Sequence, residues 1–377
     1  MPFAERQIIK MKYKILLYTL GNVMPKEKTR FTCPNPAANP MLQKRSQEFY
    51  DCLYDQFDIV AWACGRHSVN PYTMRDNEIW GEKMLNFVSK IRQNGMTFDF
   101  SIQMSGHPNM VHPYDYFVFT DGIARELDFT ILDNISFPLW EKNGVHEQDA
   151  LYQNACGIIS FSNLGQHVLN TYHRVPPNRT TVICPQIDTS DSSLCVQDPY
   201  KLLFVGADKE NKGVKNLLKA FAELRKDSSQ YSLTLVGLSD FYCGLPGVSV
   251  MPFISDAYAL TEIYKEHGIF IMPSYKENLG LVYLEAMLHG LPVIVTSRGG
   301  MAEYVRKAKS GIVVSPDNVD EIVAAVKTIQ NQYLEFSFSA VHFATMNAKN
   351  EIVSDRILDF IDSCYQKKAH CADYVQY

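Results

Sequence analysis

The sequence predicts an α/β protein with two doubly wound parallel sheets, one in each half of the chain. Short apolar runs recur along the sequence, and amphipathic segments with helical spacing separate many of them. The pattern stops and restarts once near the middle. A chain of 377 residues is long enough to bury two separate cores.

The first half contains six predicted strands and two predicted helices. The strands are residues 13–19, 57–63, 98–103, 115–120, 157–161 and 181–184, and the helices are 147–156 and 163–173. The second half repeats the alternation more regularly. Its strands are residues 201–205, 232–236, 248–251, 269–273, 292–296 and 311–314, and its helices are 213–226, 256–266, 280–289, 301–307, 317–330 and a tail at 350–365.

The segment "PQIDTSDSSLCVQDP", residues 185–199, interrupts this alternation. Its Ser, Asp and Pro content is typical of a linker, so we place a domain boundary between residues 190 and 191. Ligands of open parallel sheets bind at the carboxyl ends of the strands. We therefore expect a binding cleft between two such domains.

Charge and composition limit the possible partners. The net charge of −5 does not indicate the basic surface that nucleic-acid binding requires. No apolar run is long enough for a transmembrane helix, which leaves at most peripheral membrane contact. The nine cysteines form no CxxC pair, so we expect free thiols, no zinc site and a cytoplasmic location.

The stretch "IFIMPSYKENLGLVYLEAMLHGLPVI", residues 269–294, combines a buried strand with a helix start. Asn278 is the predicted N-cap of that helix. Its position would direct the backbone N–H groups of Leu279, Gly280 and Leu281 toward an anion.

Glu277 precedes this corner, and Glu285 lies inside the helix among apolar residues. A carboxylate with such neighbours needs hydrogen-bond donors. Sugar hydroxyls could supply them, and so could a neighbouring backbone N–H at the edge of the helix.

A polar loop runs from Gly206 to Gly213 after another predicted strand. Lys212, at the start of the helix that follows, can hold a phosphate as a point charge, and Lys209 is a second candidate. The alternative is a solvated loop without a ligand.

The second half resembles the retaining glycosyltransferases of family 4, which have the GT-B fold of two Rossmann-like domains facing each other across a cleft. The resemblance lies in "FVGADKENKG", "LVG", "IFIMPSYKENLGLVYLEAMLHGLPVIVTSRGGMAEYV" and "SGIVVSPDNVDEIVAAV", which occur in the order and spacing of the family. It covers residues 200–330 strongly and the first half in outline.

This resemblance implies a role for each matching position. Glu285 would hold the donor ribose, and Glu277 would contact hydroxyls of the transferred sugar. The backbone of Asn278, Leu279 and Gly280 would touch the sugar and the diphosphate, which Lys212 would neutralise. The family usually has Arg after the glycine at Gly206, where this chain has Ala207, so half of the expected positive charge is missing.

In the first half, "YTLGNVMPK" fits the glycine loop of the family, and Gly21 would present an amide to the diphosphate. His107 and Asp121 end two later strands where the family keeps donor and acceptor contacts; a structural histidine and a capping aspartate are the alternatives. The resemblance makes residues 1–190 the acceptor-side domain, joined by a C-terminal helix at 350–377, and residues 191–349 the donor domain.

The predicted reaction moves a sugar from a nucleotide-diphosphate donor to a glycan, lipid-linked or other hydroxyl acceptor, with retention at the anomeric carbon. The leaving phosphate would help to deprotonate the acceptor, with Glu277, Lys212, Asp121 and His107 as the catalytic candidates. The chain has no Asp-x-Asp pair, and helix N-termini with lysines can stabilise the departing diphosphate, so we predict no metal and no cofactor.

Two alternatives stay open. A nucleotide-sugar-binding protein with lost or weak turnover is favoured by Ala207. A phosphorylase or epimerase on the same fold is the other. A phosphorylase would be expected to need a pyridoxal lysine and a longer chain, and an epimerase would not require the glutamate pair.

Overall fold

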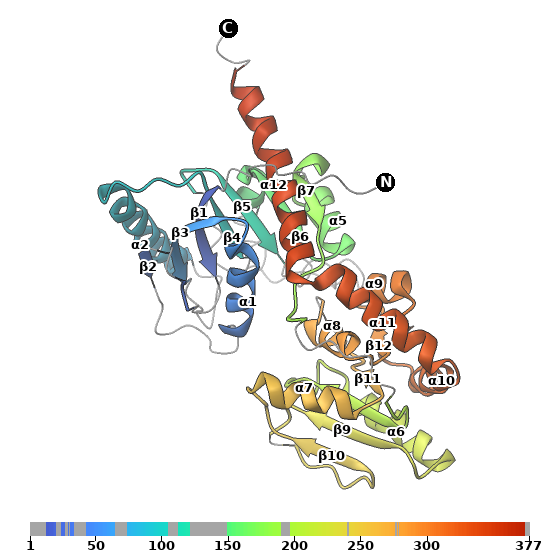
Figure 1. The fold of residues 1–377 in the computed structure, drawn as a ribbon. Coiled ribbons are helices and arrows are strands. Elements are labelled where there is room, and N and C mark those ends of the chain that lie inside the picture. The colour runs from blue at the N-terminus through green and yellow to red at the C-terminus, as the bar shows by residue number, and fades with distance from the viewer. Residues whose placement is uncertain are drawn as a thin grey trace, which may run out of the picture. The chain divides into compact units, whose positions relative to one another are not determined.

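The computed structural model describes residues 13–19, 24–26, 29, 31–33, 43–64, 74–104, 112–120, 149–189, 197–239, 241–275, 277 and 279–373. These residues divide into two compact units (Figure 1). The first unit comprises the described residues up to Thr120, residues 149–159 and the chain from Ile357 onward. The second unit comprises Ser160–Arg356.

The first sheet has seven strands in the order β2-β3-β1-β4-β5-β6-β7. Strand β1 pairs in parallel with both β3 and β4, so the strand order reverses beside it. Helices α1 (Gln43–Tyr54), α2 (Met74–Gln93) and α5 (Asn163–Thr171) connect its strands. The strands are β1 (Lys14–Thr19), β2 (Phe31–Cys33), β3 (Asp58–Cys64), β4 (Phe100–Met104), β5 (Tyr116–Thr120), β6 (Gly157–Ser160) and β7 (Thr180–Val182).

The second sheet has six strands in the order β10-β9-β8-β11-β12-β13, and every pairing in it is parallel. From β8 the chain steps outward to β9 and β10, and it then returns to β11 on the other side of β8. The switch point of this sheet therefore lies between β8 and β11. The strands are β8 (Lys201–Val205), β9 (Ser232–Val236), β10 (Val248–Met251), β11 (Ile269–Ile271), β12 (Val293–Thr296) and β13 (Gly311–Val314).

One large core of buried apolar side chains joins the second sheet to its helices. Helix α8 supplies Leu284, Ala286 and Met287 to this core, and α11 runs alongside it (Figure 1). The helices that follow β8 up to α12 are α6 (Val214–Asp227), α7 (Ala257–Glu266), α8 (Leu281–Leu288), α9 (Met301–Ala308), α10 (Val319–Asn331) and α11 (Tyr333–Ala348).

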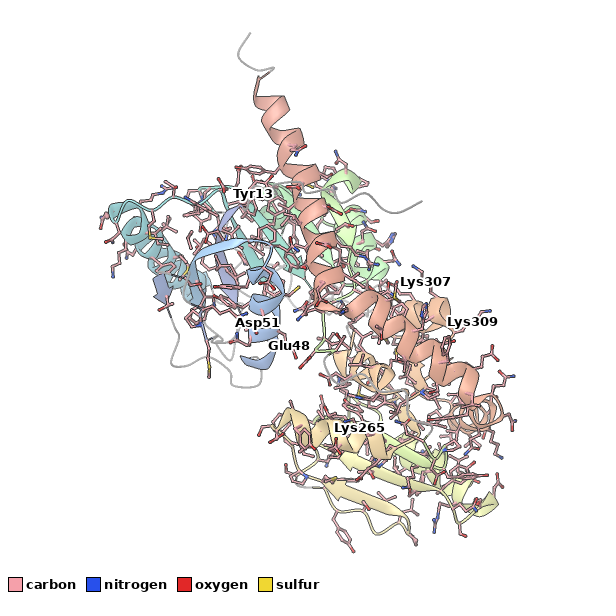
Figure 2. The ribbon with its side chains drawn as sticks, in the orientation of Figure 1. Tyr13, Glu48, Asp51, Lys265, Lys307 and Lys309 are labelled. Atoms are coloured by element: carbon pink, nitrogen blue, oxygen red, sulfur yellow. The ribbon has the colours of Figure 1, made fainter. Side chains whose placement is uncertain are left out.

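The last helix, α12 (Asn350–Asp373), begins in the second unit and ends in the first. The ring of Tyr365 lies 5.7 Å from that of Tyr13, which Figure 2 labels, and 5.3 Å from that of Phe100, so this part of α12 packs on the first sheet. Burial and a hydrogen bond to Asp362 on the same helix raise the pKa of Tyr13.

The predicted class, two Rossmann-like parallel sheets, is confirmed, and each predicted strand overlaps an observed one. Strand β2 and helices α1, α2 and α11 were not predicted. The predicted N-cap was wrong: Gly280 caps α8, in a left-handed conformation with φ 71°. The boundary at residue 190 stays a prediction, because β7 belongs to the first sheet while its contacts place it in the second unit.

Candidate functional site

Two loops meet at the switch point of the second sheet. One connects β8 to α6, and the other connects β11 to α8. The amide of Tyr275 in the second loop donates a 2.8 Å hydrogen bond to the carbonyl of Asn211 in the first. This edge of a doubly wound sheet is where ligands are expected to bind.

Gly213 sets how closely these loops approach. It has φ 71°, and a Cβ at this position would lie 2.0 Å from the carbonyl oxygen of Pro273. A side chain would therefore meet both backbone strain and a backbone clash. Only glycine lets α6 begin directly against the end of β11.

Lys212 and Glu277 form an ion pair across the two loops. The Lys212 Nζ lies 2.5 Å from the Glu277 Oε2, and their side chains are only 21% and 13% exposed. The Tyr283 ring lies against Gly280, where an added Cβ would be 2.7 Å from it, and its hydroxyl donates to the carbonyl of Met272 at 2.6 Å. Burial, followed by the charge of Glu277, raises the pKa of Tyr283 well above its usual value.

Two glycines surround Glu277. A Cβ on Gly280 would lie 3.0 Å from the Glu277 Cδ, and one on Gly299 would lie 2.4 Å from the Glu277 carbonyl oxygen. Gly280 provides no side-chain cap to α8. The N–H groups in the first turn of a helix lack intrahelical acceptors, so the start of α8 carries partial positive charge beside this carboxylate.

Glu285 lies on α8, and one of its partners is a phenol. The hydroxyl of Tyr264 on α7 donates a 3.2 Å hydrogen bond to the Glu285 Oε2. Tyr264 is only 2% exposed and its ring stacks on His289 at 5.6 Å, which fixes its direction. The Tyr264 hydroxyl is thus one of the hydrogen-bond donors that a carboxylate among apolar residues needs.

The other predicted residues of the β8–α6 loop differ in their contacts. A Cβ on Gly206 would lie 3.4 Å from the Lys212 Cγ, so Gly206 lies against the lysine of the ion pair. The ammonium of Lys209 lies 5.7 Å from the centre of the Phe241 ring. The amide of Gly206 donates to the carbonyl of Val236 at 2.9 Å, and Ala207 is exposed. Gly21, His107, Asp121 and Asn278 lie outside the described residues.

Tyr264, Tyr275 and Asn216 at this site were not predicted. The sequence did not indicate a role for Tyr264, because its contact with Glu285 depends on how α7 packs. Asn216 could have been found, since an amide stands among the apolar residues of the amphipathic segment that became α6. A buried amide needs hydrogen-bond partners, and that need points to a specific role.

Comparison with known proteins finds similar sequences for the part of the chain that contains this site. Residues 186–337 match the family model described as Glycosyl transferases group 1. An uncharacterized glycosyltransferase of Methanocaldococcus jannaschii is 30% identical over 151 residues, which cover 37% of this chain and 38% of that protein. The chain spans less than half the length of the curated relatives that it matches.

Solved structures match nearly the whole chain. Sucrose-phosphate synthase from Thermosynechococcus elongatus has a TM-score of 0.66 at 16% identity, covering 94% of this chain and 100% of that one. HepE from Anabaena, solved with UDP-glucose, has a TM-score of 0.58 at 16% identity, with 93% and 100% covered. Among the described residues, no helix combines the length and apolar character needed to cross a membrane.

The family match includes β8, α6, β11 and α8, the elements that carry Lys212, Glu277 and Glu285. The likeness in structure extends over both sheets. The chain thus has the GT-B fold, and its residues 186–337 match the model of the glycosyl transferases group 1.

Proposed function

We propose that this chain transfers a sugar from a nucleotide-diphosphate donor to a hydroxyl acceptor, with retention at the anomeric carbon. One observation carries the proposal: Lys212 and Glu277, of opposite charge, meet at the switch point between β8 and β11. An ammonium suits a diphosphate and a carboxylate suits sugar hydroxyls. A nucleotide sugar offers both groups on one molecule.

Each charge of the ion pair would exchange its partner when the donor binds. Lys212 would turn from Glu277 to the diphosphate, and Glu277 would accept hydrogen bonds from the sugar. The pair keeps both partly buried charges neutralised in the free chain, which limits the cost of desolvation. The site is therefore organised for both groups before the donor arrives.

The start of α8 supplies the rest of the donor site in this proposal. Backbone N–H groups at Leu279, Gly280 and Leu281 would face the diphosphate. Glu285, oriented by Tyr264, would hold the ribose hydroxyls. Helix N-termini and Lys212 would stabilise the leaving diphosphate, so the proposal needs no metal.

The first unit would bind the acceptor, a glycan or a lipid-linked molecule, and the leaving phosphate would help to deprotonate it. Gly21, His107 and Asp121 stay predictions for this side. A cytoplasmic location, with at most peripheral membrane contact, belongs to the same proposal. The presence of UDP-glucose in the HepE structure makes it the first donor to test.

A second candidate is a protein that binds a nucleotide sugar with little or no turnover. Ala207 favours it, because this exposed position has no positive charge to offer a leaving group. An assay of turnover separates the two candidates. The protein is incubated with UDP-glucose, ADP-glucose and GDP-mannose, with and without simple glycoside acceptors, and release of the nucleoside diphosphate is followed.

Release that depends on an acceptor, with a product of the donor's anomeric configuration by NMR, supports the transferase. Binding without release supports the second candidate. A product of inverted configuration would contradict the proposed retaining reaction.

A further inference from the structure

Asn216 connects three loops at the carboxyl edge of the second sheet. It lies in the first turn of α6 and is only 7% exposed. Its Nδ2 donates to the Tyr275 hydroxyl at 2.7 Å and to the Pro316 carbonyl at 2.9 Å. Both hydrogens of the amide nitrogen therefore have acceptors, one after β11 and one after β13.

Tyr275 extends this connection. Its hydroxyl accepts from Asn216 and hydrogen-bonds to Asp317, and burial together with Asp317 raises the pKa of Tyr275. Its backbone amide donates to Asn211 at 2.8 Å. Tyr275 is thus held to the β8–α6 loop through its backbone and to the first turn of α6 through its side chain.

The residues of this connection are close in sequence to those of the Lys212–Glu277 ion pair. Lys212 precedes Asn216 by four residues, and Glu277 follows Tyr275 by two. The bond from Asn216 to Tyr275 therefore joins the first turn of α6 to the β11–α8 loop, next to the place where the ion pair joins the two loops. Unlike the ion pair, it involves no group that the proposed donor needs.

We propose that Asn216 is a positioning residue, which through Tyr275 keeps the loops of Lys212 and Glu277 at the spacing that a nucleotide-diphosphate sugar requires. This inference rests on the proposed function. When the donor separates Lys212 from Glu277, the loops lose their ion pair at the moment when spacing matters. The neutral bond between Asn216 and Tyr275 stays in place through that exchange.

The test uses the full chain and calorimetric titration with UDP-glucose, ADP-glucose and GDP-mannose, followed by the nucleoside monophosphate of the donor that binds. The variants are Asn216→Leu, Tyr275→Phe and the double variant. Tyr231→Phe is the matched control. Its hydroxyl also bonds an amide side chain, that of Gln330 at 2.8 Å, but at the amino end of β9.

We expect Asn216→Leu and Tyr275→Phe each to weaken nucleotide-sugar binding about 10-fold, the factor that one lost hydrogen bond can supply. The double variant should be no weaker than Asn216→Leu, because both remove one connection. The monophosphate, which lacks the β-phosphate and the sugar, should bind all variants alike. Tyr231→Phe should keep the wild-type affinity whatever its melting temperature.

Equal losses for the sugar nucleotide and the monophosphate would overturn the positioning role, as would equal effects of Tyr275→Phe and Tyr231→Phe. Unchanged affinity in all variants would overturn it too. If Asn216→Leu does not fold, Tyr275→Phe alone decides between these outcomes. Failure of the proposed donor site is distinct, because the wild type itself would then bind no nucleotide sugar, and both proposals would fall. Failure of turnover alone would leave the binding results, and the role of Asn216 in donor binding, standing.

Discussion

The hydroxyl of Tyr264 on α7 donates a 3.2 Å hydrogen bond to the carboxylate of Glu285 on α8. These residues come from different helices, so the bond fixes the Glu285 side chain relative to the second sheet. A carboxylate held in this way can accept further hydrogen bonds, since each of its oxygens has two lone pairs. The ribose hydroxyls of a nucleotide would be suitable donors.

We therefore predict that Tyr264→Phe weakens nucleotide-sugar binding by about 3- to 10-fold, the range of one hydrogen bond that orients a ligand contact. Tyr258→Phe on the same helix is the control, because Tyr258 is 71% exposed. Calorimetric titration of both variants is the measurement. Equal affinities of the two variants would show that Tyr264 does not orient a ribose contact.

We predict that variants of the Lys212–Glu277 ion pair change the unfolding free energy and donor binding in different ways. Lys212→Met leaves the carboxylate of Glu277, which is 13% exposed, without its ammonium, and should cost about 1–3 kcal/mol of unfolding free energy. Adding Glu277→Gln should restore most of that loss, because a neutral amide needs no counter-charge. Donor binding should be lost in both variants.

Urea unfolding and calorimetry on the two variants provide this comparison. A double variant that is as unstable as Lys212→Met would mean that the loss does not come from an unpaired, partly buried carboxylate. A double variant that still binds a nucleotide sugar with wild-type affinity would mean that the pair does not lie in the donor site.

Gly213 and Gly95 share a φ of 71° and differ in their surroundings. A Cβ on Gly213 would lie 2.0 Å from the Pro273 carbonyl oxygen, whereas a Cβ on Gly95 would meet nothing within 4 Å. Gly95→Ala should therefore cost about 1 kcal/mol for the left-handed conformation alone. Gly213→Ala should cost about 2 kcal/mol more, because the two loops must move apart.

Denaturant unfolding of the two alanine variants gives both values. Equal losses would mean that the loops at Gly213 can separate without cost, in which case their close packing does not fix the ion pair.

The surroundings of His112 predict how the unfolding free energy changes as the pH falls. Its Nε2 is 2.7 Å from the Gln103 Oε1, its Nδ1 is 3.0 Å from the Tyr114 hydroxyl, and Tyr18 stacks on its ring. All three partners are uncharged at acidic pH. Burial lowers the pKa of His112 to about 4.

The unfolded chain takes up a proton at this histidine near pH 6.5, while the folded chain takes it up only near pH 4. The contribution of neutral His112 is therefore complete above pH 6.5 and is lost as the pH falls to 4, by about 3 kcal/mol. His112→Gln should remove this part of the pH dependence. Unfolding free energies of both proteins from pH 7.5 to 4 test this, and parallel curves would contradict it.

The strands could be predicted because parallel sheets bury both faces, which leaves continuous apolar runs such as "IFIM" at residues 269–272. Helix α11 could not be predicted in this way. Its sequence, "YLEFSFSAVHFATMNA", places apolar residues on every side, and Leu334 and Phe338 are exposed at 64% and 63%. Such a segment shows no clear helical period.

The N-cap of α8 failed for a different reason. Asn is a good cap by its own chemistry, but the chain needs a left-handed residue at Gly280 to pass Tyr283, whose ring would lie 2.7 Å from an added Cβ. That contact is tertiary. Local preference gave the type of element, and packing decided where it begins.

The candidate site shows the same division. Glu277, Glu285 and Lys212 could be singled out from local pattern and resemblance, and the structure pairs the first with the third. The contacts of Tyr264 and Asn216 link residues 21 and 59 positions apart in the chain, so no local pattern encodes them. The cleft expected between the domains stays a prediction.

The measurement that most directly tests the account is stabilisation of the chain by nucleotide sugars. UDP-glucose, ADP-glucose and GDP-mannose are added to the wild type, to Glu285→Gln and to Glu262→Gln, a control on α7 whose carboxylate pairs with Lys265 at 3.0 Å. A donor at 100 times its dissociation constant should add about 2.7 kcal/mol to the wild type and raise its melting temperature by a few degrees. We predict this rise in the wild type and in Glu262→Gln and its loss in Glu285→Gln; a wild type that no nucleotide sugar stabilises would contradict the proposed donor site.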